Sequence, residues 1–304
     1  MKKFRKLKET NILAQRKTVN EKIVFGIAFL LFCVYAFSLL FPLVHLLTTS
    51  LKDYYTYITV GDSFTLPPFD RIDFANYIDA LKEMYLLDSY MRPIYLYEML
   101  WNSVWYTVGS SMLGVLFSAF TAYALTKYQF HGRNLIYAII IFTMTIPIIG
   151  STGSTLKLLS TLGIYNTPFF LLTACSGFGF NFMILYGFFK SLPWSFAEAV
   201  FIDGGSDFTA FFRIMLPQAK SAIFTLVIMA WIGAWNDYTT ALLYLPDFPT
   251  IASGLYRVQD KAITSGDIPV YFAGLVLSII PVIVIFSCCS DTIMKNFTLG
   301  GLKG

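Results

Sequence analysis

The stretch SFAEAVFIDGGSDFTAFFRIMLPQ (Ser195 to Gln218) decides the fold, because it is polar and helix-like yet lies between two strongly apolar segments. Ser195 and Glu198 have the S-x-x-E spacing of a capping box, which predicts that a helix begins at this point. Its expected apolar face consists of Phe196, Ala199, Val200 and Ile202. The pair Gly204-Gly205 should end the helix, because glycine tolerates the left-handed turn that follows a helix end.

A second helix is expected directly after the two glycines. Ser206 or Asp207 can accept a hydrogen bond from its first amides. The helix should end before Pro217, because the residue that precedes a proline disfavours the helical backbone. The segment is therefore predicted to form a helix, a hinge and a second helix that leads into the next apolar segment. Its local chemistry alone also fits an ordinary amphipathic loop resting on a membrane surface.

The composition indicates a membrane protein. The 304 residues are 56% hydrophobic and 13% charged, whereas a soluble domain carries about 25% charged residues. No segment has the G-x-x-x-x-G-K-[ST] pattern that binds nucleotide phosphates. Two histidines and four cysteines offer no metal-ligand spacing. We therefore expect no metal site and no cofactor bound by this chain.

Six segments are apolar over roughly the 20 residues that a helix needs to cross the hydrocarbon core. They are residues 23–47, 101–125, 135–149, 168–189, 221–243 and 271–290. The sequence thus predicts an all-α, polytopic fold with six transmembrane helices in residues 23–290. A basic tail (residues 1–22) precedes this domain and a second tail (residues 291–304) follows it.

The basic residues set the expected orientation. Fifteen of the 22 lysines and arginines lie in the two tails and in the second and fourth connections, and seven lie elsewhere. Because cytoplasmic segments carry the excess of basic residues, both termini and the connection 190–220 should be cytoplasmic. The long connection 48–100 should face outward, and it is large enough for short helices of its own.

Polar residues within two predicted spans are candidates for a substrate pathway. SGFGFN (residues 176–181) places two glycines and an asparagine in mid-membrane, where discontinuous helices often line a pathway. A simple packing notch would leave the same pattern. WNDY (residues 235–238) includes an ionisable residue, which is costly inside a membrane and usually faces a cavity or a partner helix. The candidates are Asn181, Trp235, Asn236, Asp237 and Tyr238.

The segment EAVFIDGGSDFTAFFRIMLP resembles the EAA loop of bacterial ABC importer permeases. In that loop Glu-Ala-Ala is followed by three residues, Gly, nine residues, Ile, one residue and Leu-Pro. The residues in register here are Glu198, Ala199, Asp203, Gly204, Ile214, Leu216 and Pro217. Val200 replaces the second alanine, which is a mild departure.

Three other segments extend the resemblance. WNSVWYTVGSSMLGVLFSAFTAYALTKYQFHGR (residues 101–133) is similar to the family's second span and the connection after it. WNDY resembles the Trp-Asn-Asp motif of the sugar-importing branch, and FTLGGLKG (residues 297–304) resembles that branch's ending. Together they resemble the maltose-type carbohydrate permeases, specifically the smaller six-span partner.

The resemblance implies a non-catalytic subunit of a heteromeric importer in the bacterial cytoplasmic membrane. Its implied partners are a second permease subunit, two cytoplasmic ATPase subunits that use ATP and Mg, an extracytoplasmic solute-binding protein, a sugar and membrane lipid, with no nucleic acid. Glu198 would pair with a basic residue of the ATPase, and Ala199 must be small to enter its cleft. Gly204 would permit the turn, and Leu216-Pro217 would fix the start of the fifth span.

Three alternatives stay open at this point. The chain could be a permease of the same superfamily for a peptide, polyamine or phosphate. An intramembrane enzyme would need paired catalytic groups or metal ligands within the spans, for which Asp237 is the one clear intramembrane carboxylate. An ion-driven secondary transporter would usually show more buried charges and internal repeats.

Overall fold

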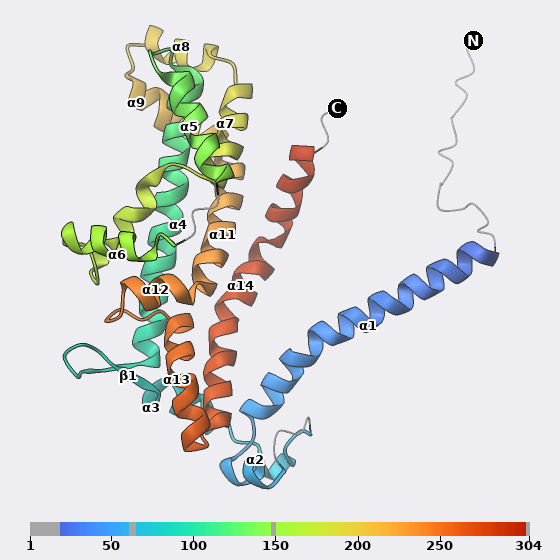
Figure 1. The fold of residues 1–304 in the computed structure, drawn as a ribbon. Coiled ribbons are helices and arrows are strands. Elements are labelled where there is room, and N and C mark those ends of the chain that lie inside the picture. Colours follow the sequence, from blue (N-terminus) through green and yellow to red (C-terminus); the bar gives the residue numbers. More distant parts are fainter. Residues whose placement is uncertain (1–18, 61–64, 147–149, 302–304) are drawn as a thin grey trace.

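The computed structural model describes residues 19–60, 65–146 and 150–301, and it is almost entirely helical. Figure 1 shows an elongated bundle with one helix, α1, standing away from it. The longer helices are α1 (Val19–Ser50), α4 (Leu96–Lys127), α5 (Arg133–Thr145), α7 (Phe180–Ser191), α11 (Lys220–Asn236), α13 (Ile251–Ser265) and α14 (Ile268–Gly301). The shorter ones are α2 (Tyr54–Val60), η2 (Phe69–Arg71), α3 (Ala75–Glu83), α6 (Thr152–Thr161), η3 (Pro168–Ser176), α8 (Ser195–Ile202), α9 (Asp207–Thr209), the π-helix η4 (Ala210–Met215), α10 (Leu216–Gln218) and α12 (Tyr238–Tyr244). The strands β1 (Tyr85–Leu87) and β2 (Pro93–Tyr95) form an antiparallel hairpin.

Three helices among the described residues are long and apolar enough to cross a membrane: α1, α4 and the first part of α14. Two bent pairs pass the same test when each is taken as one span, η3 with α7 and the run 207–218 with α11. The remaining predicted span corresponds to α5, which has 13 residues, and residues 147–149 lie outside the described residues. The all-α membrane fold is therefore confirmed, and the count of six spans stays a prediction.

The predicted fourth span is discontinuous, as the glycines of SGFGFN indicated. η3 ends at Gly177, which has φ +68°, and α7 begins after Gly179, which has φ +100°. The two helices meet at an angle of 49°. A side chain at Gly177 would be strained and would also meet Thr121 Oγ1 at 2.5 Å. The break therefore packs directly against α4.

The predicted fifth span, residues 221–243, is not one helix. α11 ends at Asn236, and α12 begins at Tyr238. The reason is local: the Asp237 carboxylate accepts a hydrogen bond from the Thr240 amide at 3.0 Å and so caps a new helix. Hydrophobicity continues through this junction, so a search for apolar length alone could not detect it.

α4 is the central helix of the bundle. It packs against α7, η3 and α11 along most of its length. Near the end that carries α8 to α10, here called the inner end, its residues Val115, Ala119 and Ala122 are fully buried among residues of α7, η4 and α11. Near the opposite, outer end, Leu96 and Met99 are buried against α13.

The outer end is built largely from the connection 48–100, which forms its own short elements as predicted. The Asn76 side-chain amide of α3 donates to the carbonyls of Ser50 (2.9 Å) and Lys52 (2.8 Å). Asp247 joins three loops: its carboxylate accepts from the Ser89 amide at 2.8 Å and from the Asn166 side chain at 2.6 Å. These bonds fix the hairpin against the rest of the outer end.

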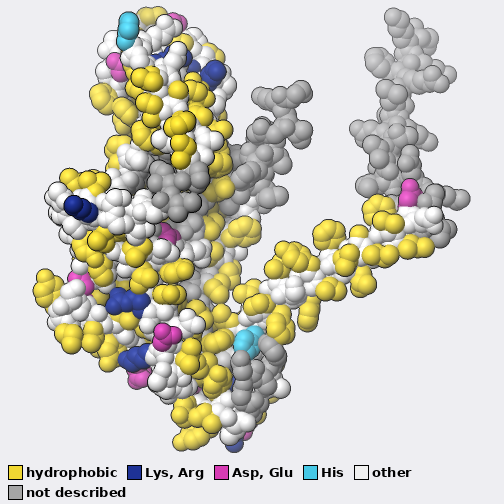
Figure 2. All heavy atoms as spheres, in the orientation of Figure 1, with side chains coloured by type: hydrophobic (Ala, Val, Ile, Leu, Met, Phe, Trp, Pro, Cys, Tyr) yellow, Lys and Arg dark blue, Asp and Glu magenta, His cyan; other side chains and the backbone are white. Residues whose placement is uncertain are grey.

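α1 covers no face of the bundle for most of its length. From Ile23 to Val44 its large apolar side chains expose between 42% and 72% of their surface, and Figure 2 shows them as a nearly continuous hydrophobic rod. The helix meets α14 at its other end, where His45 packs edge-on against Phe272 at 5.5 Å.

Candidate functional site

The segment 195–218 forms a helix, a turn and a second helical run at the inner end of the molecule, and we call it the coupling module (Figure 1). The predicted capping box is wrong, because Trp194 is the N-cap of α8 and Ser195 is already its first helical residue. The Trp194 carbonyl accepts from the amides of Ala197 (2.8 Å) and Glu198 (3.2 Å). A helix therefore begins where the sequence indicated, but one residue earlier than a Ser195 cap would require.

The buried face of α8 also differs from the prediction. Ala197 is fully buried, and Val200 and Phe201 pack against the same core. Phe196 and Ile202, assigned to the apolar face, are 42% and 85% exposed. The prediction assumed that the most apolar side chains face inward, whereas the core of this chain accepts a small residue at this point.

The turn and the second cap follow the sequence closely. Gly204 has φ +77°, the left-handed backbone that glycine accommodates. Ser206 is the N-cap of α9, and its hydroxyl accepts from the Thr209 amide at 3.3 Å. The predicted positions of the hinge and of the second helix start are thus confirmed.

The second helical run does not end before Pro217. It continues through α9, η4 and α10 to Gln218 and bends by 77° into α11. In the π-helical part the Leu216 amide donates to the Phe211 carbonyl, five residues back. Pro217 follows directly after this π-helical turn, in the first turn of α10. Leu216-Pro217 therefore lies just before the sharp bend.

The coupling module exposes a mixed surface to solvent. Glu198, Ala199 and Asp203 are exposed, and so are the large side chains of Ile202 (85%), Phe208 (65%) and Phe212 (53%). A surface that combines a few carboxylates with exposed apolar side chains is typical of a protein-binding site. Ile214 and Leu216, by contrast, are half-buried.

The pathway candidates divide into two groups. Trp235 is 3% exposed, stacks on Trp231 at 4.9 Å and donates its indole N–H to the Ser278 carbonyl of α14 at 3.0 Å. These contacts give Trp235 a packing role between α11 and α14. Pro281 lies three residues beyond Ser278 in α14, where a proline disturbs the regular helical bonds.

Asn236 and Tyr238 are the exposed members of the α11–α12 junction. The Asn236 amide donates to the Ile232 carbonyl at 2.8 Å, and Tyr238 stacks on Tyr256 of α13 at 4.7 Å. Asp237 between them is engaged in capping α12. Asn181 is half-buried near the start of α7, on a different element.

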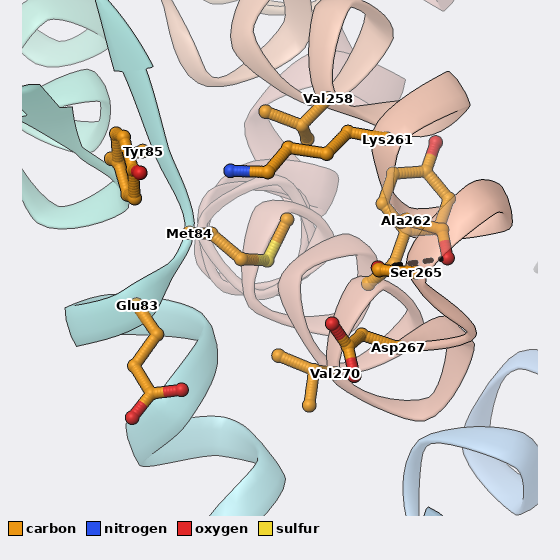
Figure 3. Close-up of a pocket in the computed structure, with 10 residues that line it drawn as sticks. Glu83, Met84, Tyr85, Val258, Lys261, Ala262, Ser265, Asp267 and Val270 are labelled. Carbon is orange, nitrogen blue, oxygen red and sulfur yellow. Dashed lines mark hydrogen bonds between the residues drawn. The ribbon is translucent and has the colours of Figure 1, made fainter.

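The outer end also holds a pocket that the sequence did not indicate. It has a volume of about 170 Å³ and lies between the α3–β1 segment and helices α13 and α14 (Figure 3). The Lys261 ammonium lies 4.3 Å from the centre of the Tyr85 ring, and Asp267 and Ser265 line the same pocket. Its residues come from two distant segments and form no motif, so only the fold brings them together.

Comparison with known proteins shows similarity to permease subunits over nearly the whole chain. The diacetylchitobiose uptake system permease protein NgcG of Streptomyces coelicolor is 28% identical over 295 residues, which cover 96% of this chain and 93% of that protein. The arabinooligosaccharides transport system permease protein AraQ of Halalkalibacterium halodurans is 26% identical over 275 residues, covering 90% and 94%.

A solved structure supports the same assignment. A chain of a bacterial ABC transporter involved in the import of the acidic polysaccharide alginate superposes with a TM-score of 0.73 at 25% identity. The superposition covers 91% of this chain and 99% of that chain. Residues 114–298, more than half of the chain and including the whole coupling module, match the family of binding-protein-dependent transport system inner membrane components. The chain belongs to this family and is a permease subunit of an ABC transport system.

Proposed function

We propose that this chain is one of two permease subunits of an ATP-driven importer of oligosaccharides. An extracytoplasmic binding protein delivers the sugar, and the coupling module docks onto a cytoplasmic ATPase. The observation that carries the proposal is the module itself: an exposed Glu198-Ala199 pair on α8, followed by the left-handed turn at Gly204. A permease without a nucleotide-binding motif needs a partner to hydrolyse ATP with Mg, and this surface is where such a partner fits.

The docking surface suggests how each residue contributes. Glu198 offers an exposed carboxylate to a basic residue of the ATPase, and Ala199 leaves room beside it because its side chain is small. Ile202 and Phe208 supply exposed apolar area on either side of the turn. Removing such side chains from water contributes about 25 cal/mol per Å² of apolar surface, before the entropic cost of association is subtracted.

The same module connects docking to the transmembrane helices. α8 is short and its inner face is fixed in the core through Ala197. The helical run from Asp207 to Gln218 then meets α11 at 77°. A displacement of α8 by the ATPase would therefore be transmitted to α11 and would alternately open a central site to the two sides of the membrane.

Sugar contact is assigned to the α11–α12 junction. Asn236 and Tyr238 are exposed there, where the amide can hydrogen-bond to hydroxyl groups and the ring can pack on an apolar sugar face. Relatives named for diacetylchitobiose and arabinooligosaccharides favour an oligosaccharide over a peptide or polyamine.

Both termini are assigned to the cytoplasm, on the side of the coupling module.

A thermal-shift screen of the cognate binding protein tests the substrate class. We expect a raised melting temperature with chito- or arabino-oligosaccharides at concentrations well above their dissociation constants, and none with peptides or polyamines. Stabilisation by a peptide or polyamine alone would replace the sugar assignment while leaving the importer assignment intact.

A further inference from the structure

The inner end of α4 holds the coupling module at two points. The Lys127 ammonium donates to the Leu192 carbonyl, just before α8 begins. The Tyr128 hydroxyl donates to the Asp207 carboxylate at 2.6 Å, at the start of α9. Lys127, the last residue of α4, and Tyr128, its C-cap, thus bind segments that lie 65 and 79 residues away in sequence, and α8 lies between these two segments.

Both bonds are of a strong type. Each has one charged partner, and the short distance between Tyr128 and Asp207 is typical of a hydroxyl that donates to a carboxylate. The Tyr128 ring also packs on Trp194, the N-cap of α8, at 5.9 Å, and Trp194 packs on Phe201 at 5.9 Å. The segments on both sides of α8 are therefore held to the end of α4, and Trp194 at the start of α8 adds an aromatic contact.

The bond to Asp207 lies at the edge of an apolar contact between α4 and the module. A cavity of about 220 Å³ lies beside it, lined by Phe120, Tyr123 and Ala124 of α4 and by Phe208 and Phe211 of the module. Phe211 packs against Phe120 and Tyr123 of α4 at 5.5 and 4.9 Å, so the Tyr128 hydroxyl adds a directional polar contact at the start of α9 to this apolar packing.

The outer end of α4 is equally well attached. The Ser103 hydroxyl accepts from the Ile251 amide at 2.7 Å, and the Asn102 side chain donates to the Pro249 carbonyl at 3.2 Å. Gly254 of α13 lies directly against Met99. Both sets of contacts lie on α4, a single unbroken helix of 32 residues that is about 48 Å long.

We propose that Lys127 and Tyr128 are positioning residues that couple movement of the module to α4, and that α4 carries this movement to α13 at the outer end. The proposal rests on the proposed function, because it assumes that an ATPase moves the module. Under this proposal, movement of the module reaches the rest of the chain by two routes. The first runs through α11 to the α11–α12 junction, and the second runs through α4 to the extracytoplasmic loops.

The first experiment tests the attachment without any substrate. The full transporter is purified through a tag on this chain, and hydrogen–deuterium exchange is measured for residues 195–209. In Tyr128→Phe, which removes one oxygen atom, we expect these amides to exchange about tenfold faster, the factor that corresponds to losing one hydrogen bond to a charged group. Asp207→Asn keeps an acceptor oxygen and should lie between wild type and Tyr128→Phe.

Matched variants separate the bond from general damage. Tyr186→Phe removes a hydroxyl from the same core cluster, on a ring that packs against Tyr137 of α5, and should leave exchange of residues 195–209 unchanged. Lys127→Met should speed the exchange of amides near Leu192, just before α8. Lys127→Arg, which keeps a charged donor, should restore the wild-type rate. Exchange in Tyr128→Phe and Lys127→Met equal to wild type would overturn the attachment.

The second experiment tests transmission, with Mg, ATP and vanadate trapping the ATPase in its closed state. In wild type we expect exchange to change in residues 195–209 and also in residues 249–258 at the outer end. In the double variant Lys127→Met, Tyr128→Phe, exchange in residues 195–209 should still change on trapping. The change in residues 249–258 should fall to half of the wild-type change or less.

The outcomes distinguish the two proposals. An undiminished response of residues 249–258 in the double variant would overturn the role of α4. A wild-type transporter in which trapping alters neither segment would instead contradict ATPase docking on the module, and with it the proposed function, while the first experiment would still decide whether Lys127 and Tyr128 hold the module.

Discussion

Gly204 and Gly205 are adjacent glycines that are required for different reasons. Gly204 has φ +77°, and a Cβ atom added there would meet nothing within 4 Å. Its requirement is therefore conformational. Gly205 has no positive φ, but an added Cβ would collide with Val200 of α8. The first glycine sets the direction of the chain and the second allows the chain to pass close to the helix that it has just left.

Substitution at Gly204 should reveal this difference. Gly204→Val forces a β-branched side chain into the left-handed region, where the backbone cost for an L-residue is about 1–2 kcal/mol, so the turn should change and uptake should be abolished. Gly204→Asn should retain most uptake, because asparagine visits this region more readily. Uptake at matched membrane abundance is the measurement, and normal uptake by Gly204→Val would contradict the role of the turn.

Glu198 is exposed, so its replacement should affect docking and not folding. We expect Glu198→Lys to abolish uptake while the transporter still inserts in the membrane, because the reversed charge would repel the basic residue expected on the ATPase. Glu198→Gln should be a milder variant. Wild-type uptake by Glu198→Lys, with normal membrane abundance, would remove this residue from the docking surface.

At the scale of elements, helix boundaries show what the sequence can and cannot predict. The hinge at Gly204, the cap at Ser206 and the break at Gly177 were predictable, because each depends on a residue with a strong local backbone preference. The buried face of α8 and the passage of the helix through Pro217 were not. They depend on which surface of the bundle the helix meets, and a sequence read alone does not contain that surface.

The candidate site was predictable to a similar extent. Spacing and family resemblance predict coupling roles for Glu198 and Gly204, and these roles stay predictions, but nothing in the sequence linked Lys127 and Tyr128 to the module. Those contacts bridge 65 and 79 residues, and they arise only because α4 and the module meet at the inner end.

The α11–α12 junction gives a prediction at this scale. Asp237 caps α12 through the Thr240 amide, and loss of such a cap costs about 0.5–2 kcal/mol. Asp237→Ala should therefore lower the thermal stability of the purified transporter, whereas Asp237→Asn and Asp237→Ser, which also cap, should not. If Asp237→Asn abolished sugar uptake without changing the melting temperature, the carboxylate would be a sugar ligand as well as a cap.

At the scale of the whole molecule, one carboxylate joins loops from three parts of the chain. Burial alone would raise the pKa of Asp247, but hydrogen bonds from Ser89 and Asn166 and the charge of Arg257 outweigh it and lower the pKa. Because the folded-state pKa lies below the unfolded value, the stabilisation is present above about pH 4 and is lost as the pH falls through the folded-state pKa.

Asp247→Ala tests this directly. The variant leaves the Ser89 amide and the Asn166 side chain without their acceptor, so at pH 7 we expect a loss of about 1–3 kcal/mol in the free energy of unfolding. The difference from wild type should narrow as the pH falls below about 4, because the carboxylate of the unfolded chain takes up a proton there while the folded carboxylate, with its lowered pKa, is still ionised. A difference that stays constant between pH 7 and pH 3 would show that the charge of Asp247 is unimportant.

The isolated course of α1 has a consequence for how this chain tolerates change. Between Ile23 and Val44 the large apolar side chains remain largely exposed. Selection for the fold of this subunit therefore acts on the length and hydropathy of that segment and hardly on the identity of its residues. Exchanges among leucine, isoleucine, valine and phenylalanine should be neutral there, and any position that proves intolerant would mark a contact with a neighbouring subunit.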